Sequence, residues 1–578
     1  MSNQNSNVFQ EKEFRQKGAL VPFLKRILKV SLKHKKDMYQ FLFWIVIVAI
    51  ADAIFPIVVM NLIDKELGPR LAENIGAGIQ GQTDSNAPEG FRSAIKYVLI
   101  FFAIGMAQVT GVFFFVRHAG RVQEFVLFDL RKQLFDKLQE LQASFYDKNA
   151  IGWLLTRLTS DTDRVTELIS WGLVDLIWGL VMINVCIMVL FVYSWKIALM
   201  VLLSLPLLLI ASVRIRMLVL KWSRVSRKIN SEITASFNEH IGGVQLIKAT
   251  VQERATGQEF SKLSGAMRRA SFRASGYTAI YGPLVIFIGS IVAAGVILLG
   301  GQLAIAVPAG ITVGVLAASF EYATRIFLPV LDISRFYALA QGSLSAGERI
   351  FSLLDEPVLI QDPENGASFD KIEGVIEFDQ VSFSYVEDKP VLSNMSFYIP
   401  SGQSVALVGP TGEGKSTIAK LVGRYYDINE GAIKVDGVDI RDRKMESLRI
   451  QMGVVLQHPH LFSGSIRSNI KYGKPDATEE ELIDAIRILG AEEFISRLDE
   501  EVGEAGVSLS EGERQIISFI RAVLANPAIL VMDEATSSVD TVMEQKIQRG
   551  VKKIIKNRTS IIIAHRLSTI KSCDRIIV

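Results

Sequence analysis

The chain has 578 residues, 49% of them hydrophobic, and a mean hydropathy of +0.30. It is therefore too apolar for an ordinary soluble enzyme, and its length predicts at least two domains. The net charge of only +3 gives no reason to expect a nucleic-acid partner, and two cysteines, Cys186 and Cys573, are too few for a disulfide framework or a cysteine metal set.

The N-terminal segment changes from polar to amphipathic. Residues 1–20 are polar and are predicted to form a disordered arm. In residues 21–36, apolar side chains alternate with lysine and arginine, which is typical of a helix lying in the membrane surface with its basic groups among the lipid headgroups. A solvated basic arm is the alternative, but a well-formed apolar stripe favours the interfacial helix; the stripe consists of Leu24, Ile27, Leu28 and Leu32.

Six apolar stretches are long enough to cross about 30 Å of hydrocarbon as helices. They make 21–335 a predicted transmembrane domain and lie near 41–63, 97–116, 170–193, 197–213, 278–300 and 311–331. The connection 221–274 holds ten Lys/Arg against four Glu, whereas 64–96 has a slight acidic excess. Because positive charge is retained on the cytoplasmic side, both termini are predicted to be cytoplasmic.

The connections between the spans differ in length. Spans three and four, and spans five and six, are joined by short turns. The cytoplasmic connections run for roughly fifty to sixty residues each and keep helical periodicity, for example over 125–142 and 229–247. We therefore expect the membrane helices to continue as rigid cytoplasmic stalks.

Three ionisable residues within the spans invite two interpretations. Glu321 and Arg325 are four residues apart, so they share a helix face and can partly neutralise each other, and Asp52 lies in the first span. Ionisable groups in hydrocarbon are costly and usually face a bundle interior or a wet cavity. They either line a pathway through the membrane or fix the packing of the helices, and the sequence leaves both open.

After a predicted linker at 336–372, residues 373–578 read as a soluble α/β domain. A buried strand is expected at 405–408, followed by Gly409-Pro-Thr-Gly-Glu-Gly-Lys-Ser416 and a helix at 417–423, which is the phosphate loop in its required setting. Its glycines let backbone N–H groups surround phosphate oxygens, Lys415 reaches the terminal phosphates, and Ser416 can bind Mg²⁺. The predicted nucleotide contacts are Gly409, Thr411, Gly412, Gly414, Lys415, Ser416 and Thr417.

A second apolar strand, expected at 529–532, ends in Asp533 and Glu534. Asp533 suits a direct or water-mediated Mg²⁺ contact, and Glu534 would polarise the water that attacks a γ-phosphate. The sequence stops at Ile576-Ile-Val578, inside an expected strand, from which we expect a C-terminal truncation.

Further motifs accompany this pair in the soluble half. They are Val381-Ser-Phe-Ser-Tyr385, Val455-Leu-Gln457, Glu501-Val-Gly-Glu-Ala-Gly506, Leu509-Ser-Glu-Gly-Glu-Arg-Gln515, Asp533-Glu-Ala-Thr-Ser-Ser-Val-Asp540 and Ile563-Ala-His565-Arg-Leu-Ser. In this order they resemble the adenine-stacking aromatic, Q-loop, X-loop, signature motif, Walker B with D-loop, and H-loop of ATP-binding-cassette (ABC) exporters. With the six spans and long stalks, the resemblance to the type I exporter fold (type IV transporter fold) covers almost the whole chain.

The resemblance implies an all-α six-helix transmembrane domain with cytoplasmic stalks, fused to an α/β P-loop NTPase domain. It implies ATP-driven export of amphipathic or hydrophobic compounds across a bacterial plasma membrane by alternating access. A lipid or peptide exporter is the nearest alternative, and a non-transporting ATPase that gates a partner is another. The coupling helices of such exporters correspond to 145–156 and 235–243. The second normally docks on the ATP-binding domain (the motor domain) of the partner.

The resemblance also assigns roles in the ATP site. Glu534, His565 and Gln457 are assigned to catalysis. Mg²⁺ is assigned to Ser416, Gln457 and Asp533. Tyr385 would stack on adenine, and the nucleotide contacts shared between two motor domains are assigned to Ser510, Glu511, Gly512 and Asp540. Because the chain has one motor domain, a second half-transporter is required as partner.

The signature motif departs from the family pattern. Glu511 stands where glycine is usual and Glu513 replaces glutamine. A carboxylate about 5 Å from a γ-phosphate charge would cost roughly 3 kcal/mol at an effective dielectric near 20, unless the side chain turns outward. Because the other motifs are intact, the chain resembles the catalytic-glutamate subunit of bacterial heterodimeric multidrug exporters, and we favour a heterodimer over a homodimer.

Overall fold

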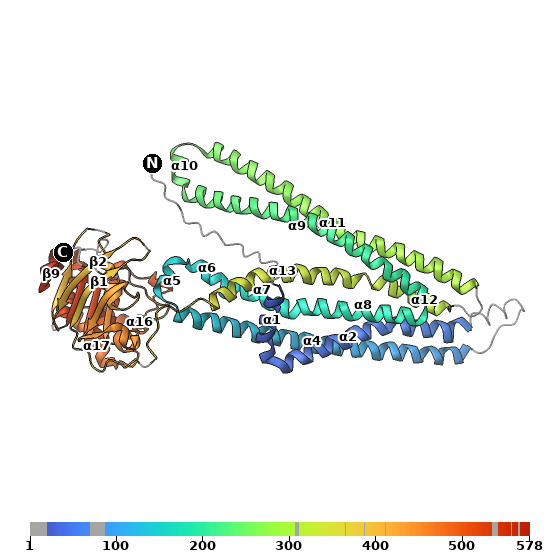
Figure 1. Cartoon of the computed structure of the whole chain (residues 1–578), viewed down its shortest axis with the longest axis horizontal. Helices are drawn as coiled ribbons and strands as arrows, with labels where there is room; N and C mark the ends of the chain where they lie inside the picture. Colours follow the sequence, from blue (N-terminus) through green and yellow to red (C-terminus); the bar gives the residue numbers. More distant parts are fainter. Residues whose placement is uncertain are drawn as a thin grey trace, which may run out of the picture. The chain divides into compact units, whose positions relative to one another are not determined.

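A computed structural model describes residues 20–69, 87–306, 311–364, 366–386, 388–410, 412–533, 541–556, 558–563 and 567–578 (Figure 1). The chain divides into two compact units. The first consists of Met1–Asp136 and Leu154–Asp355, and the second of Lys137–Trp153 and Glu356–Val578. The second unit therefore includes a short segment from between two membrane helices. The N-terminal arm expected at 1–20 lies almost wholly outside the described residues.

The first unit is built from long helices. Its N-terminal part holds α1 (Leu20–Ser31), α2 (Lys35–Leu62) and α4 (Ala87–Glu140). A helical run with two π-helical stretches then contains α6 (Ile151–Thr156), α7 (Thr162–Glu167) and α8 (Leu173–Tyr193). The remaining helices are α9 (Trp195–Gly242), α10 (Val244–Ala249), α11 (Glu253–Ala306), α12 (Val313–Arg325) and α13 (Leu328–Leu354).

Six helical segments among the described residues are long and apolar enough to cross a membrane. They are Val21–Leu67, Ile95–Glu140, Ile151–Tyr193, Trp195–Gly242, Glu253–Ile305 and Val313–Leu354. The helix α4 alone has 54 residues, which is about 80 Å of helix against about 30 Å of hydrocarbon. Each segment therefore extends well past a bilayer. The helix α13 also continues to Leu354, beyond residue 336, where we expected a linker to begin.

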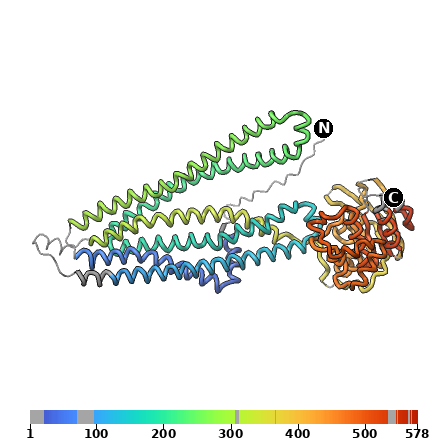
Figure 2. Tube along the Cα trace, turned by 180° about the vertical axis from the view of Figure 1, so that it is seen from behind, coloured from blue at the N-terminus to red at the C-terminus, as the bar shows by residue number. Residues whose placement is uncertain are grey.

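The helices α9 and α11 form a hairpin closed by α10. In Figures 1 and 2 the tip of this hairpin stands apart from the other helices of the first unit. Apolar side chains are exposed around the tip: Phe237, Ile241 and Leu246. Phe237 packs against Phe260 on α11, with ring centroids 4.8 Å apart, whereas Ile241 and Leu246 are each 68% exposed.

The polar residues of the spans are engaged with one another. The Glu321 carboxylate accepts hydrogen bonds from Arg325, at 2.6 Å from Nη2, as the four-residue spacing predicts. The Asp52 carboxylate accepts from Gln108 on α4 and, at 3.0 Å, from Trp178 Nε1 on α8. The contacts of Asp52 join three helices, α2, α4 and α8.

The second unit contains two sheets. The first has the order β2-β1-β4-β5 and is antiparallel, with β1 at Ile376–Phe383, β2 at Leu392–Ile399, β4 at Glu430–Val435 and β5 at Val438–Asp439. The second has the order β6-β7-β8-β3-β9 and is parallel. Its strands are β3 (Ser404–Leu407), β6 (Met452–Val455), β7 (Ile529–Asp533), β8 (Thr559–Ile563) and β9 (Arg575–Ile577).

The central strands of the parallel sheet are buried on both faces. Along β3, Val405 and Leu407 pack into one apolar cluster and Ala406 into the other, as the two-residue period of a strand requires. Parallel strands are joined by crossover connections, which are usually helices, and helices accordingly pack around this sheet. They are α14 (Lys415–Val422), α15 (Met445–Arg449), α16 (Ile466–Lys471), α17 (Glu479–Leu489), α18 (Glu511–Ala525), α19 (Thr541–Ile555) and α20 (Leu567–Ile570).

Candidate active site

The phosphate loop connects the end of β3 at Leu407 to the start of α14 at Lys415. Gly412 and Gly414 have φ values of 98° and 83°, in the left-handed region that favours glycine. A Cβ on Gly414 would also lie 2.8 Å from Leu392 Cδ2. The loop can therefore turn tightly at the helix N-terminus only with glycine at these positions.

Lys415 and Ser416, at the end of the loop, both make polar side-chain contacts. The Lys415 ammonium donates to the carbonyl oxygens of Gly409 and Pro410, both at 2.7 Å, so it is folded over the loop. The Ser416 hydroxyl is exposed and donates to Asp533 Oδ2 at 3.0 Å. The fold thus brings together two predicted metal-binding residues that are 117 positions apart.

This pair fits Mg²⁺ chemically. A hydroxyl and a carboxylate supply hard oxygen donors, and Mg²⁺ in nucleotide sites is usually held by one or two protein oxygens together with phosphates and water. The third predicted ligand, Gln457, is exposed two residues beyond β6. Because β6 and β7 are parallel neighbours, Gln457 and Asp533 follow strands at the same carboxyl edge.

Four predicted site residues, Thr411, Glu534, Asp540 and His565, lie outside the described residues. Glu534 follows Asp533 directly, and His565 comes two positions after the end of β8.

Tyr385 lies beside the helix that follows the phosphate loop. Its hydroxyl is 3.2 Å from the Thr417 hydroxyl, and 37% of its surface is exposed. Its ring packs edge-on against Phe383 and Tyr426, with centroid separations of 4.8 and 5.1 Å. Sequence reasoning singled out Tyr385 but missed Tyr426, for which the motifs carry no signal.

The signature motif forms a capping box at the start of α18. The Ser510 hydroxyl accepts from the Glu513 backbone N–H, and the Glu513 carboxylate accepts from the Ser510 N–H and hydroxyl, both at 2.9 Å. Arg497 donates to the same carboxylate at 2.6 Å. Burial raises the pKa of Glu513, but the hydrogen bonds from Arg497 and Ser510 outweigh it, so the pKa lies below its usual range. The spacing Ser-x-x-Glu could have predicted this cap.

The other two signature residues also lie at the start of α18. Glu511 is its first residue and is partly buried, and Gly512 is buried. Of the two departures from the family pattern, Glu513 places its carboxylate against the N-terminus of α18, where Ser510 and Arg497 hold it.

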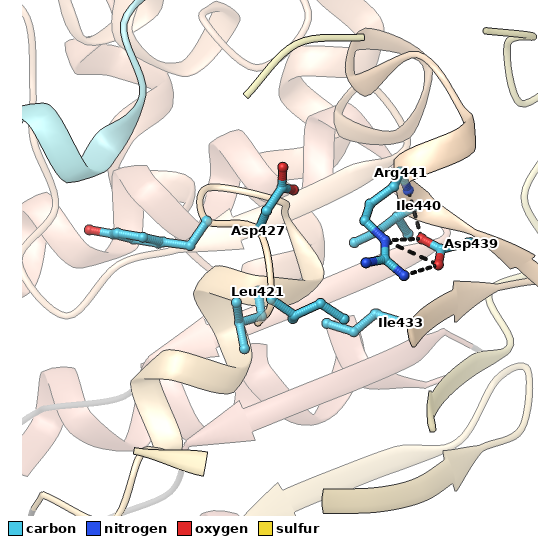
Figure 3. Close-up of a pocket in the computed structure, with 8 residues that line it drawn as sticks. Leu421, Asp427, Ile433, Asp439, Ile440 and Arg441 are labelled. Carbon is cyan, nitrogen blue, oxygen red and sulfur yellow. Dashed lines mark hydrogen bonds and ion pairs between the residues drawn. The ribbon is translucent and has the colours of Figure 1, made fainter. Parts of the chain in front are cut away.

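A small pocket in the same unit is lined in part by Tyr426. Figure 3 shows its lining, which includes Leu421, Ile433 and Ile440, and Ile440 lies beside a charged pair. That pair is Arg441 with Asp439, joined at 2.7 Å. Since these charges neutralise each other, we interpret the pocket as packing space.

Comparison with known proteins agrees with this geometry. Residues 38–330 match the family described as "ABC transporter transmembrane region", and 392–537 match "ABC transporter". The chain belongs to the ABC transporters. It is 34% identical to the ATP-dependent lipid A-core flippase of Desulfotalea psychrophila, over 83% of this chain and 84% of the relative. It is also 34% identical to a putative multidrug export ATP-binding/permease protein, YgaD, of Bacillus subtilis, over 78% and 79%.

The fold is shared with a solved ABC transporter. A bacterial Atm1-family ABC exporter with ATP bound superposes with a TM-score of 0.76 at 25% identity, covering 94% of both chains. The predicted family, fold class and ATPase activity coupled to transport are confirmed. This ABC transporter is a multi-pass plasma-membrane protein of the exporter type.

Proposed function

We propose that the chain is one half of a dimeric exporter that uses ATP hydrolysis to move amphipathic or lipid-like compounds across the membrane. The observation that carries the proposal is the contact between the Ser416 hydroxyl and Asp533, which brings a phosphate loop and a strand-end carboxylate together in a chain with six membrane helices. In this proposal both termini are cytoplasmic.

Each site residue has a chemical role in the proposal. Backbone N–H groups of the phosphate loop and Lys415 hold the phosphates, and Tyr385 stacks on adenine. Ser416, Asp533 and Gln457 would hold Mg²⁺, which supplies charge neutralisation on the phosphates when bound. Glu534 orients and polarises the attacking water, and His565 contacts the γ-phosphate.

The test of this assignment is Glu534→Gln. It removes the base but keeps the size of the side chain, so we expect ATP turnover to fall at least about a hundredfold, in line with loss of general-base catalysis. Binding of a fluorescent ATP analogue should stay within about threefold, because the substitution leaves the phosphate loop unchanged. A fall of only half, in a pair containing one substituted chain, would argue for two equivalent sites.

We further propose an asymmetric dimer with a different half-transporter. In a two-motor site, the signature helix of one chain would cap the γ-phosphate held by the other. Here Ser510 holds the negatively charged Glu513 carboxylate at the helix N-terminus, so like-charge repulsion makes this helix end a poor phosphate cap. The chain would then supply competent Walker motifs to one site and a weak signature to the other.

A paired substitution separates this scheme from a homodimer. Glu511→Gly with Glu513→Gln restores the usual motif and should raise hydrolysis or binding at the second site only. Equal changes at both sites would favour a homodimer.

The substrate class is proposed from two relatives, one named a lipid A-core flippase and the other a putative multidrug exporter. Both names point to amphipathic cargo. Stimulation of the ATPase activity by cationic amphiphilic dyes would indicate a multidrug exporter. Stimulation by phospholipids would indicate a lipid exporter. ATP turnover without flux of either in sealed vesicles would instead favour a gating ATPase.

A further inference from the structure

A row of aromatic side chains leads from the proposed adenine side of the site to the segment 137–153. The Tyr385 ring lies edge-on to Tyr426 at 5.1 Å, and Phe383 lies edge-on to both, at 4.8 and 5.8 Å. Lys420, on the helix that follows the phosphate loop, lies 5.7 Å from the centroids of both tyrosine rings. Displacement of Tyr385 therefore has a direct steric path to Tyr426.

Tyr426 ends this row in a charge-assisted hydrogen bond. Its side chain is 7% exposed, and its hydroxyl donates to the Asp147 carboxylate on α5 (Ala143–Lys148). Burial raises the pKa of Tyr426, and the bond to Asp147 raises it further, so the hydroxyl keeps its proton and remains a donor. A hydrogen bond to an ionised group is stronger than one between neutral groups.

The segment that carries Asp147 is continuous with two membrane helices. It follows α4, which ends at Glu140, and precedes α6, which begins at Ile151. Other contacts also attach it to the second unit: the Leu359 N–H donates to Gln142 Oε1 at 3.2 Å, and Ala143 packs against the apolar cluster of the sheet. A change at Tyr426 would thus act on a short, well-anchored connection.

We propose that Tyr426 is a positioning residue that couples the base of the bound nucleotide to the segment 137–153 through its hydrogen bond to Asp147. The inference rests on the proposed function, in which adenine stacks on Tyr385. Stacking restrains the Tyr385 ring, the edge contact restrains Tyr426, and the hydroxyl transmits the restraint to α5. Because coupling is reciprocal, the same bond must make nucleotide affinity depend on the segment.

The test compares a nucleotide with a ligand that lacks a base. An environment-sensitive fluorophore is placed on α5 by Lys148→Cys in a Cys573→Ser background of the assembled exporter, in phospholipid nanodiscs. ATP and inorganic tripolyphosphate are then titrated with Mg²⁺. In Tyr426→Phe, which keeps the ring and loses the hydroxyl, we expect the ATP response to fall at least about fivefold, the lower end of measured couplings. The tripolyphosphate response should be unchanged.

Two further variants identify the contact. Asp147→Asn should reproduce the Tyr426→Phe effect, and the double variant should be no worse than either single one, because both remove the same bond. Tyr425→Phe is the matched control, since this neighbouring ring lies against Arg449, 5.0 Å from its centroid, and it should leave the response unchanged. If Tyr426→Phe does not fold, Asp147→Asn tests the coupling by itself. Asp147 is exposed, so its substitution should not disturb folding.

The outcomes separate this inference from the proposed function. An undiminished ATP response in both Tyr426→Phe and Asp147→Asn overturns the coupling. Equal losses with ATP and tripolyphosphate also overturn it, because the signal would then come from the phosphates. Failure of the unsubstituted exporter to bind a fluorescent ATP analogue, or unchanged affinity in Tyr385→Ala, would instead refute the proposed nucleotide site.

Discussion

At the scale of single residues, Glu513 determines how the signature helix α18 is capped at its N-terminus. The sequence predicts that the charge of Glu513 repels a phosphate unless its side chain turns outward, and the structure shows that its carboxylate faces its own helix N-terminus and Arg497. The negative charge is therefore stabilised locally by the N–H and hydroxyl of Ser510, by the Arg497 guanidinium and by the helix dipole. The Glu513 side chain therefore acts as part of the N-terminal cap of α18.

This cap predicts a pH-dependent contribution to stability. Because the folded-state pKa of Glu513 is depressed, its contribution is present above the ordinary pKa of 4.5 and is lost as pH falls below it. Glu513→Gln keeps the cap but removes the charge facing Arg497, so we expect a loss of about 1 kcal/mol at pH 7. In thermal unfolding, the melting temperatures of the unsubstituted protein and of Glu513→Gln should converge below pH 4.5. A constant difference across this range would contradict the assignment.

At the scale of elements, one contact determines how α12 begins. Asp64, just after α2, accepts from the Gly314 N–H at 2.7 Å and from the Thr312 hydroxyl, which itself caps the helix. A Cβ on Gly314 would lie 2.4 Å from the Met60 carbonyl oxygen, so the two helices approach as closely as glycine permits.

Gly314→Ala should therefore force α12 away from α2. Overpacking against backbone costs typically 1–3 kcal/mol, so we expect a loss of about 2 kcal/mol and a lower melting temperature in detergent. Gly301→Ala is the control, because a Cβ there meets open space. Equal melting temperatures for the two variants would show that α12 can shift without cost.

At the scale of the whole molecule, the α9–α11 hairpin presents apolar side chains that are exposed in the described part of the chain. Ile241 and Leu246 are each 68% exposed near its tip. Exposed apolar groups at the end of a long projecting hairpin are typical of a protein interface. We propose that they contact the ATP-binding domain of a partner subunit.

Leu246→Glu should consequently impair assembly without unfolding the chain. The introduced charge stays in water in the isolated chain but would be buried in the dimer, and we expect at least tenfold weaker association, about 1.4 kcal/mol. Co-purification with a tagged partner measures this. Gln252→Glu, at a nearby exposed polar position, should leave assembly intact; equal losses for both would indicate a general charge effect.

The sequence by itself determined those features that depend on local pattern. Six apolar stretches predicted six membrane helices, the four-residue spacing predicted the Glu321–Arg325 pair, and the glycine-rich motif predicted a tight turn before the helix at Lys415. Each follows from helix periodicity or from backbone conformation over fewer than about twenty-five residues.

Only the tertiary structure decided the contacts between distant segments. The Ser416–Asp533, Asp64–Gly314 and Tyr426–Asp147 contacts join residues 117, 250 and 279 positions apart. No periodicity links such residues, because their approach depends on how whole helices and strands pack. The role of Glu513 was equally decided by packing, since the same carboxylate would repel a phosphate or cap its own helix according to the direction in which Arg497 and Ser510 hold it.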